Sequence, residues 1–118
     1  MDKYDKFRRM CEQKLPNAIK DIGERKLVIW GASRGGEIAK EYLELKGIKA
    51  ECFVDSKYKE KDEFLGLEVN NPEIVEKEKN YVIIAIMSFV YDIEELLKKK
   101  NFEHKQVVAT NFGMQLAF

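Results

Sequence analysis

A short apolar strand that runs directly into a glycine-rich turn and then into a helix constrains the fold of this chain more than any other feature. The segment covers residues 26–39 and reads K-L-V-I-W-G-A-S-R-G-G-E-I-A. Gly31 and Gly36 occupy the first and third glycine positions of a dinucleotide-binding turn, and Ser33 occupies the second. Such a turn holds a phosphate group on the free N–H groups of a helix N-terminus, where the helix dipole also favours negative charge. The motif therefore predicts a ligand that carries phosphate, with a nucleotide as the first candidate.

The residues of this turn have different expected roles. Gly31 allows the chain to turn tightly, and Gly36 allows the helix to pack closely on the strand. The hydroxyl of Ser33 either binds a phosphate or caps the helix, and Arg34 either pairs with a phosphate or stays an exposed charge. The candidate ligand-binding residues of the turn are Gly31, Ala32, Ser33, Arg34, Gly35 and Gly36. The alternative is a strand-to-helix turn that needs small residues for packing alone.

Two further groups are expected beside the turn. Asp55 ends the second predicted strand, where an acidic residue usually binds ribose hydroxyls, and Ser56 follows it. In that role Asp55 favours a nucleotide with a free 2′-hydroxyl over one with a 2′-phosphate. In the alternative interpretation Asp55 is a capping or turn-forming aspartate before a charged loop over residues 56–63. Met87 is the last residue of the most apolar segment, and Ser88 follows it. We expect both residues to close over the ligand.

Predicted strands and helices alternate along the rest of the chain. The strands are residues 27–30, 50–55, 66–69, 81–87 and 106–109, and the helices are residues 3–21, 34–46, 72–79 and a helix that begins after Ser88. This alternation predicts an α/β fold whose parallel sheet has about five strands in the spatial order 3-2-1-4-5, with a crevice beside the first strand. We expect one domain over 1–118, with an added N-terminal helix at 1–23, interrupted by Pro16 and packed outside the sheet, and a core over 26–109.

Composition excludes several classes of protein. The 21 basic and 21 acidic side chains cancel, so we expect no nucleic-acid partner. The longest apolar run, 81–87, is far shorter than the ~20 residues that span a bilayer, and the charged start is no secretory signal, so no membrane insertion is expected. Cys11 and Cys52 form no C-x-x-C motif, which predicts reduced thiols in a cytoplasmic protein. With His104 as the only histidine, we expect no metal site.

No set of catalytic residues can be assembled from the sequence, which leaves open whether the chain is part of an enzyme. His104 follows a predicted helix, far from the glycine-rich turn, and no second histidine is present. Tyr42 and Lys46 form the Y-x-x-x-K pair of short-chain dehydrogenases, but the third glycine of that fingerprint would fall on Glu37. The pair also lies on the first helix after the turn, where it cannot meet a nicotinamide. We therefore reject a dehydrogenase of that type.

The order and spacing of these motifs resemble the Rossmann-like N-terminal domain of PglD/NeuD-type sugar acetyltransferases and related proteins of nucleotide-sugar and polysaccharide biosynthesis. The matching segments are Gly31–Gly36 for a G-A-S-G-x-G turn, Phe53–Asp55 for a strand that ends in aspartate, Gly66–Val69 with Asn71–Glu73 for a strand before a proline-initiated helix, and Val82–Ile86 for an I-I-A-I strand. The resemblance covers residues 26–109. It implies a three-layer Rossmann-like sandwich in which Ser33 is a feature of the family.

The resemblance also implies a function. It suggests a domain that binds a nucleotide or nucleotide-sugar, not catalytic by itself, in bacterial surface-polysaccharide metabolism. The expected ligand is a UDP-sugar or NAD, and the expected partner is a larger polypeptide or an enzyme domain. Acetyl transfer in that family occurs in a left-handed β-helix, whose hexapeptide repeats this sequence lacks, so acetyltransferase activity is not implied. Two alternatives stay open: an NAD-binding fragment of a sugar-nucleotide epimerase, dehydratase or oxidoreductase, and an interaction module with a lost ligand site.

Overall fold

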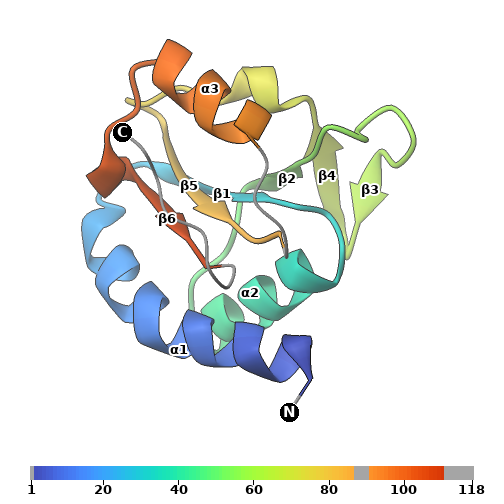
Figure 1. Ribbon diagram of the computed structural model, residues 1–118, viewed down its shortest axis with the longest axis vertical. Coiled ribbons are helices and arrows are strands. Elements are labelled where there is room, and N and C mark those ends of the chain that lie inside the picture. Colours follow the sequence, from blue (N-terminus) through green and yellow to red (C-terminus); the bar gives the residue numbers. More distant parts are fainter. Residues whose placement is uncertain (1, 87–90, 111–118) are drawn as a thin grey trace.

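The apolar segments of the chain assemble into one sheet in a computed structural model that describes residues 2–86 and 91–110. The strands are β1 (Lys26–Trp30), β2 (Cys52–Val54), β3 (Glu63–Phe64), β4 (Leu67–Asn70), β5 (Asn80–Ile84) and β6 (Val107–Ala109). They lie in the order β3-β4-β2-β1-β5-β6 (Figure 1). All neighbours pair in parallel except β3, which runs antiparallel to β4 at one edge. The α/β class and the largely parallel sheet predicted from the sequence are therefore confirmed.

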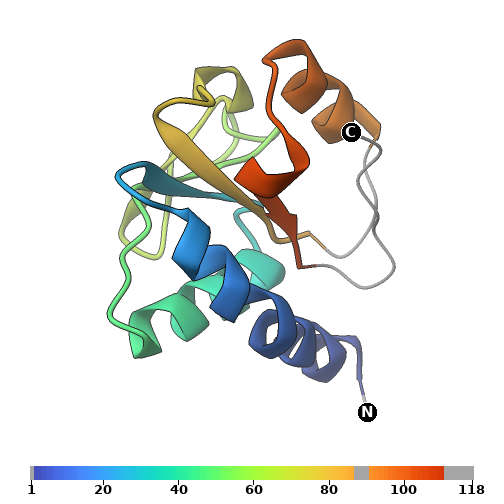
Figure 2. The same cartoon turned by 90° about the vertical axis from the view of Figure 1, so that its left-hand side faces the viewer.

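Helices cover both faces of this sheet. They are α1 (Lys3–Asp21), α2 (Arg34–Leu45) and α3 (Tyr91–Lys99), with the short 3₁₀ turns η1 (Pro72–Ile74) and η2 (His104–Gln106). Figures 1 and 2 show α1 and α2 side by side on one face and α3 on the other. Each face has its own hydrophobic core, because alternate strand residues point to opposite sides. Ile29 and Phe53 pack under α1 and α2, whereas Val28 and Val54 pack under α3 and with Val75, which follows η1.

The added N-terminal helix is continuous over its whole length. Asp2 caps α1 by accepting hydrogen bonds from the N–H groups of Tyr4 and Asp5, each at 2.9 Å. The predicted interruption at Pro16 is wrong, since α1 continues through it to Asp21. Pro16 lies on the exposed side, where water can satisfy the carbonyl that loses its partner, while Leu15 is fully buried. Core packing therefore holds the helix together across the proline.

Two segments near the edge of the sheet differ from the prediction. The helix expected over 72–79 is only the single turn η1, because the chain becomes extended at Val75 and buries that side chain completely in the core. The sheet has a sixth strand, β3, which begins in the segment predicted as a charged loop. A two-residue turn at Leu65 and Gly66, with φ of 51° and 83°, pairs β3 with β4 in a hairpin.

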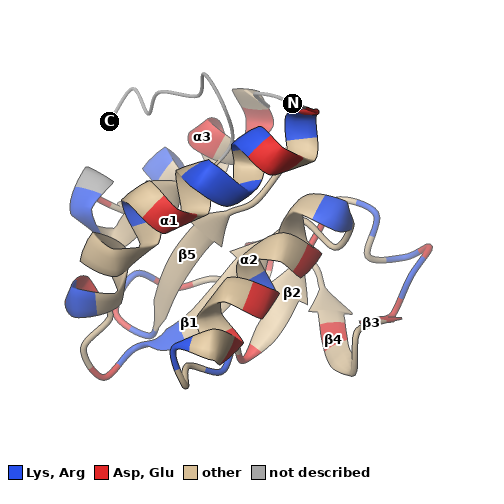
Figure 3. Ribbon diagram, turned by 90° about the horizontal axis from the view of Figure 1, so that it is seen from below, with Lys and Arg blue, Asp and Glu red and all other residues tan. Residues whose placement is uncertain are grey.

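Charges of both signs occur on the helices of the α1–α2 face, as Figure 3 shows. The inner strands β2 and β5 carry no charged residue at all, as expected for strands that are covered on both faces. This face therefore has no concentrated basic surface. In the described part of the chain, every helix is too short or too polar to cross a membrane.

Candidate ligand-binding site

The glycine-rich turn leaves β1 after Trp30 and enters α2 at Arg34, and its glycines are needed for close packing. Gly31 has a φ of +124°, and a Cβ there would lie 2.8 Å from the carbonyl oxygen of Ala85. A Cβ on Gly36 would lie 1.9 Å from the carbonyl oxygen of Gly31. The predicted conformational roles of these two glycines are confirmed. Gly35 has a packing role that sequence reasoning missed, since its Cβ would lie 2.4 Å from the Ala85 oxygen.

Ser33 is the N-cap residue of α2, but its hydroxyl makes no capping hydrogen bond. Its backbone is extended, and its side chain is exposed at the start of the helix. The first hydrogen bond inside the helix joins the N–H of Glu37 to the carbonyl of Ser33 at 2.9 Å. The N–H groups of a first helical turn have no partner within the helix. Of the two roles predicted for the Ser33 hydroxyl, capping is therefore not seen.

Asp55 follows β2 and holds the glycine-rich turn in place. Its Oδ2 accepts a hydrogen bond from the N–H of Ala32 at 2.8 Å, and its Oδ1 accepts one from the N–H of Lys57 at 2.9 Å. This is the turn-forming role that the sequence offered as the alternative to ribose binding. Each carboxylate oxygen has a second lone pair, so a ligand hydroxyl can still reach it. The N–H of Ala32, however, is already occupied.

Lys61 is a second clamp on the turn that sequence reasoning missed. Its ammonium donates to the carbonyl oxygen of Ala32 at 3.0 Å. Asp55 and Lys61 thus bind the two sides of the same residue. No local pattern points to Lys61, because it stands in a charged segment far from the turn in sequence, and only the fold brings the two together.

Arg34 points toward the helices rather than across the turn. Its Nη1 lies 2.5 Å from Oε1 of Glu37, and its guanidinium lies 5.8 Å from the ring centre of Tyr4 in α1. The hydrogen bond that Arg34 donates to Glu37 raises the pKa of Arg34. The guanidinium is therefore engaged by its own helix and by α1, and the phosphate pairing predicted for Arg34 is not seen in this arrangement.

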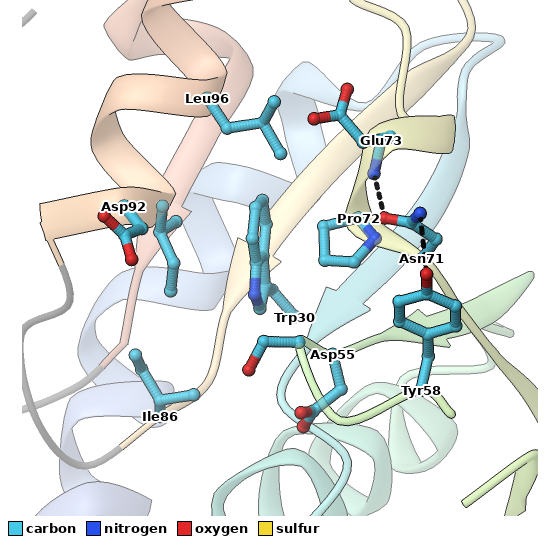
Figure 4. A pocket seen from close by; sticks show the side chains of 11 residues that line it. Trp30, Asp55, Tyr58, Asn71, Pro72, Glu73, Ile86, Asp92 and Leu96 are labelled. Carbon is cyan, nitrogen blue, oxygen red and sulfur yellow. Dashed lines mark hydrogen bonds between the residues drawn. The ribbon is translucent and has the colours of Figure 1, made fainter. Parts of the chain in front are cut away.

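A cavity of about 430 Å³ opens at the carboxyl ends of the strands, on the α3 face of the sheet, and we call it the Trp30 cavity (Figure 4). Its lining residues come from β1, η1, α3 and the segments that follow β2, β4 and β5: Trp30, Asp55, Ser56, Tyr58, Asn71, Pro72, Glu73, Ile86, Asp92, Ile93 and Leu96. Buried apolar groups form its floor, and exposed carboxylates stand at its rim. One wall is held by hydrogen bonds, because Asn71 donates to the hydroxyl of Tyr58 at 3.1 Å and accepts from the N–H of Glu73 at 3.0 Å.

A second cavity, of about 380 Å³, lies between the glycine-rich turn and the loop after β2, and we call it the lysine cavity. It is lined by Ala32, Ser33, Asp55, Lys57, Glu60, Lys61 and Val69. Two exposed lysines and the exposed Glu60 line it together with Ser33, whose hydroxyl makes no cap hydrogen bond. Asp55 lines both cavities. The residue that the two cavities share is therefore the same residue that holds the glycine-rich turn in place.

The structure brings several predicted site residues together. Ala32 and Ser33 line the lysine cavity, Ser56 lines the Trp30 cavity, and Asp55 belongs to both. Met87 and Ser88, predicted to close over the ligand, lie outside the described residues. Sequence reasoning missed the walls supplied by η1 and α3, although the position of Trp30 immediately before the turn is a usable signal for the cavity floor.

The two cysteines do not contribute to either cavity. Both are free and buried, in agreement with the predicted reduced thiols. Burial raises the pKa of Cys11 to about 12 and also raises the pKa of Cys52. Among the described residues, no three or more histidine, cysteine or acidic side chains form a group that could hold a metal ion.

Together, the fold and these cavities define an α/β domain with a small-molecule-sized site at the carboxyl edge of a largely parallel sheet. The chain belongs to the family described as C2185-like, N-terminal, whose model matches residues 23–108. The match begins just after α1 and includes the whole strand–turn–helix segment. Comparison with curated proteins gave no match, and neither did comparison with solved structures.

Proposed function

We propose that this domain binds a nucleotide or nucleotide-sugar at the carboxyl edge of its sheet and supplies binding rather than catalysis. The observation that carries the proposal is the turn over Gly31–Gly36, which brings the start of α2 to the lysine cavity, with the Trp30 cavity across Asp55. A helix N-terminus attracts a phosphate group through its free N–H groups and its dipole.

The arrangement of the strands supports this proposal. Without the edge strand β3, the parallel strands follow the order β4-β2-β1-β5-β6, which corresponds to the 3-2-1-4-5 order of a Rossmann-like sheet. In such sheets a ligand binds beyond the carboxyl ends of the strands where the order reverses, here beside β1. The Trp30 cavity lies at that position, since its lining includes the last residue of β1 and Ile86, two residues after β5.

The charges around the turn indicate where the phosphate binds. The carboxylate of Asp55 occupies the N–H of Ala32 and repels an anion there. Ser33, the N-cap residue of α2, lines the lysine cavity together with Lys57 and Lys61. We therefore place the phosphate in the lysine cavity, on Ser33 at the start of α2, where the two ammonium groups offset the charges of Asp55 and Glu60.

The resemblance to the PglD/NeuD-type domain supports a nucleotide-sugar as the ligand and a role in bacterial surface-polysaccharide metabolism in the cytoplasm. The description of the matched family refers to an N-terminal domain, which suits a module that acts beside an enzyme domain. An NAD-binding fragment of a sugar-nucleotide enzyme is the competing function. It shares the turn and differs in the ligand, so one ligand panel separates the two.

The test is a thermal-unfolding panel with UDP, UDP-glucose, NAD, NADP and coenzyme A, each at millimolar concentration. A ligand present at 100 times its Kd stabilises the folded state by about 2.7 kcal/mol. We expect UDP and UDP-glucose to raise Tm and the others to leave it unchanged. A rise with NAD alone would favour the competing function. No rise with any compound would overturn the proposal and leave an interaction module.

A pair of variants checks where the phosphate binds. Lys57→Gln combined with Lys61→Gln removes both cations of the lysine cavity, and we expect it to weaken UDP binding about 10-fold or more. Lys49→Gln is the control, because Lys49 is an exposed lysine just before β2, at the opposite end of the strands. Equal UDP affinity in the double variant and the control would contradict the placement of the phosphate.

A further inference from the structure

We infer that the Trp30 cavity receives the sugar of the bound nucleotide-sugar and selects sugars that carry no negative charge. The inference rests on the proposed function, since the phosphate in the lysine cavity supplies the anchor. It adds what the glycine-rich turn cannot determine, namely which sugars the domain accepts. Asp55 lines both cavities, so we expect one ligand to extend past its side chain from the phosphate site into the Trp30 cavity.

The indole of Trp30 is the first observation. The side chain is only 5% exposed, yet within the described part of the chain its N–H has no hydrogen-bond partner. In Figure 4 the ring stands in the cavity, with its nitrogen at the end nearer Ile86 and Asp55 and away from Leu96. Buried indole N–H groups usually find an acceptor, and an unsatisfied one needs an explanation. An acceptor oxygen from a ligand in this cavity supplies one.

The floor around the indole is apolar. Pro72 and Ile93 are buried, and Leu96 is half-buried beside them. At about 430 Å³ the cavity falls within the roughly 300–1,000 Å³ of small-molecule sites, which combine apolar walls with a few polar groups that fix orientation. A floor of this kind suits the C–H face of a sugar ring, whose hydroxyls then point to the rim.

The rim is acidic. Glu73 lies in η1, and Asp92 lies in the first turn of α3, so their carboxylates approach from opposite sides. Both are exposed, and Figure 4 shows the Glu73 carboxylate turned toward Leu96 across the cavity. Ionised carboxylates only accept hydrogen bonds, so they pair with hydroxyl or ammonium donors. The third acid, Asp55, already accepts two backbone N–H groups.

This rim has little compensating positive charge. Of the residues that the structure describes, no lysine or arginine lines the Trp30 cavity. The ammonium of Lys100 lies nearby but donates to the main-chain oxygen of Glu73 at 2.5 Å. The carboxylate of a uronic acid sugar would therefore face Glu73 and Asp92 at close range, whereas a neutral sugar would offer them hydroxyl donors. The charge of the rim thus favours uncharged or amino sugars over acidic ones.

The experiment compares UDP, UDP-glucose and UDP-glucuronate, which share the phosphate anchor and differ at the sugar. Trp30 is the only tryptophan of the chain, so its fluorescence reports directly on this cavity. We expect UDP-glucose to bind roughly 10-fold more tightly than UDP-glucuronate at low salt and to change the emission of Trp30 more than UDP does. The double variant Glu73→Gln, Asp92→Asn should reduce the preference to about 2-fold or less.

Two controls accompany this comparison. Glu24→Gln removes an exposed acid in the loop between α1 and β1, at the opposite end of the strands, and should keep the full preference. Trp30→Phe removes the N–H and keeps an aromatic ring, so in calorimetry we expect it to weaken UDP-glucose about 5-fold and to leave UDP unchanged. The free energy of unfolding of each variant, measured in urea, shows that the fold is intact.

The outcomes separate this inference from the proposed function. If UDP binds and the two sugar nucleotides bind equally, charge selection in the Trp30 cavity is wrong while the nucleotide site stands. If the Glu73→Gln, Asp92→Asn variant keeps the preference of the wild type, the acidic rim does not cause it and the inference fails. If no UDP compound binds, the proposed function fails, and the assignment of the Trp30 cavity fails with it.

Discussion

Replacing Gly36 by alanine tests the packing that holds the glycine-rich turn. A Cβ at this position would lie 1.9 Å from the carbonyl oxygen of Gly31 and 3.0 Å from Cε1 of Phe53. The first neighbour is backbone and the second is a fully buried ring, so neither can rotate away. Gly36 lies within α2, where helix propensity alone would favour alanine by about 1 kcal/mol. Helix propensity therefore predicts that Gly36→Ala raises the free energy of unfolding, whereas packing predicts that it lowers it.

The packing effect is the larger of the two. Overpacking a core costs about 1–3 kcal/mol or more, and a contact of 1.9 Å with backbone belongs at the upper end. A shift of the turn also weakens two hydrogen bonds, the one that the N–H of Ala32 donates to Asp55 and the one that its carbonyl accepts from Lys61. Each is worth about 1 kcal/mol, so the partial loss of both adds about 1 kcal/mol. After the gain in propensity is subtracted, we expect a net loss of about 3 kcal/mol. At roughly 4 °C for each kcal/mol, Tm should fall by about 12 °C.

The assay is urea unfolding followed by Trp30 fluorescence and by far-UV circular dichroism, which should report one transition. Gly47→Ala is the matched control, because Gly47 also has a positive φ, of +76°, but no atom lies within 4 Å of the position that its Cβ would take. It should cost only the left-handed backbone penalty of about 1–2 kcal/mol. A Gly36→Ala variant as stable as the wild type, or less affected than Gly47→Ala, would refute the packing account of the turn.

Three further predictions concern the clamp on the turn, the thiols and the cap of α1. Asp55→Ala leaves two backbone N–H groups without their acceptor and should lower the free energy of unfolding in urea by about 1–3 kcal/mol, whereas the exposed control Asp62→Ala should change it little. Burial raises the pKa of Cys11 to about 12, so very little of it is thiolate at pH 8, and iodoacetamide should label it slowly until urea unfolds the protein. Rapid labelling of the native protein, read by mass spectrometry, would contradict this. The hydrogen bond from the N–H of Asp5 lowers the pKa of Asp2 below its ordinary value of 3.8. The ionised carboxylate of Asp2 therefore stabilises α1 above that pH, and this stabilisation is lost as the pH falls through the lowered pKa. Circular dichroism from about pH 5 to about pH 2 should show this loss in the wild type and not in Asp2→Ala, and identical curves would argue against the cap.

The parts of the fold that local sequence determines were predictable. The helix predicted over 34–46 is observed as α2 up to Leu45, because its apolar stripe and the turn before it are local features. The uninterrupted apolar run predicted over 81–87 contains most of β5, which is buried on both faces in the interior of the sheet. In both cases the residues of one short segment are enough to predict its secondary structure.

The parts that depend on distant neighbours were not predictable in this way. Pro16 should end a helix on local grounds, but burial of Leu15 in the core under α1 keeps this helix continuous. Asn71 and Pro72 correctly mark a helix start, yet the helix stops after one turn because Val75 is drawn into the core under α3. Tertiary packing decides the outcome at each of these positions, and its energy does not appear in the local pattern.

The candidate site shows the same limit at the level of single atoms. The pattern places Asp55 at the end of a strand and the glycine-rich turn at the end of its neighbour, and parallel pairing brings both to one edge. It does not say which donors the carboxylate meets, so ribose binding and turn formation both stayed open. In the structure the carboxylate of Asp55 and the ammonium of Lys61 fix Ala32 from two sides, so the shape of the turn is set before any ligand arrives. In the function that we propose, the phosphate therefore binds beside this clamp, at Ser33. On that proposal we expect substitution of Ser33, Lys57 or Lys61, rather than of Ala32 or Arg34, to change nucleotide affinity.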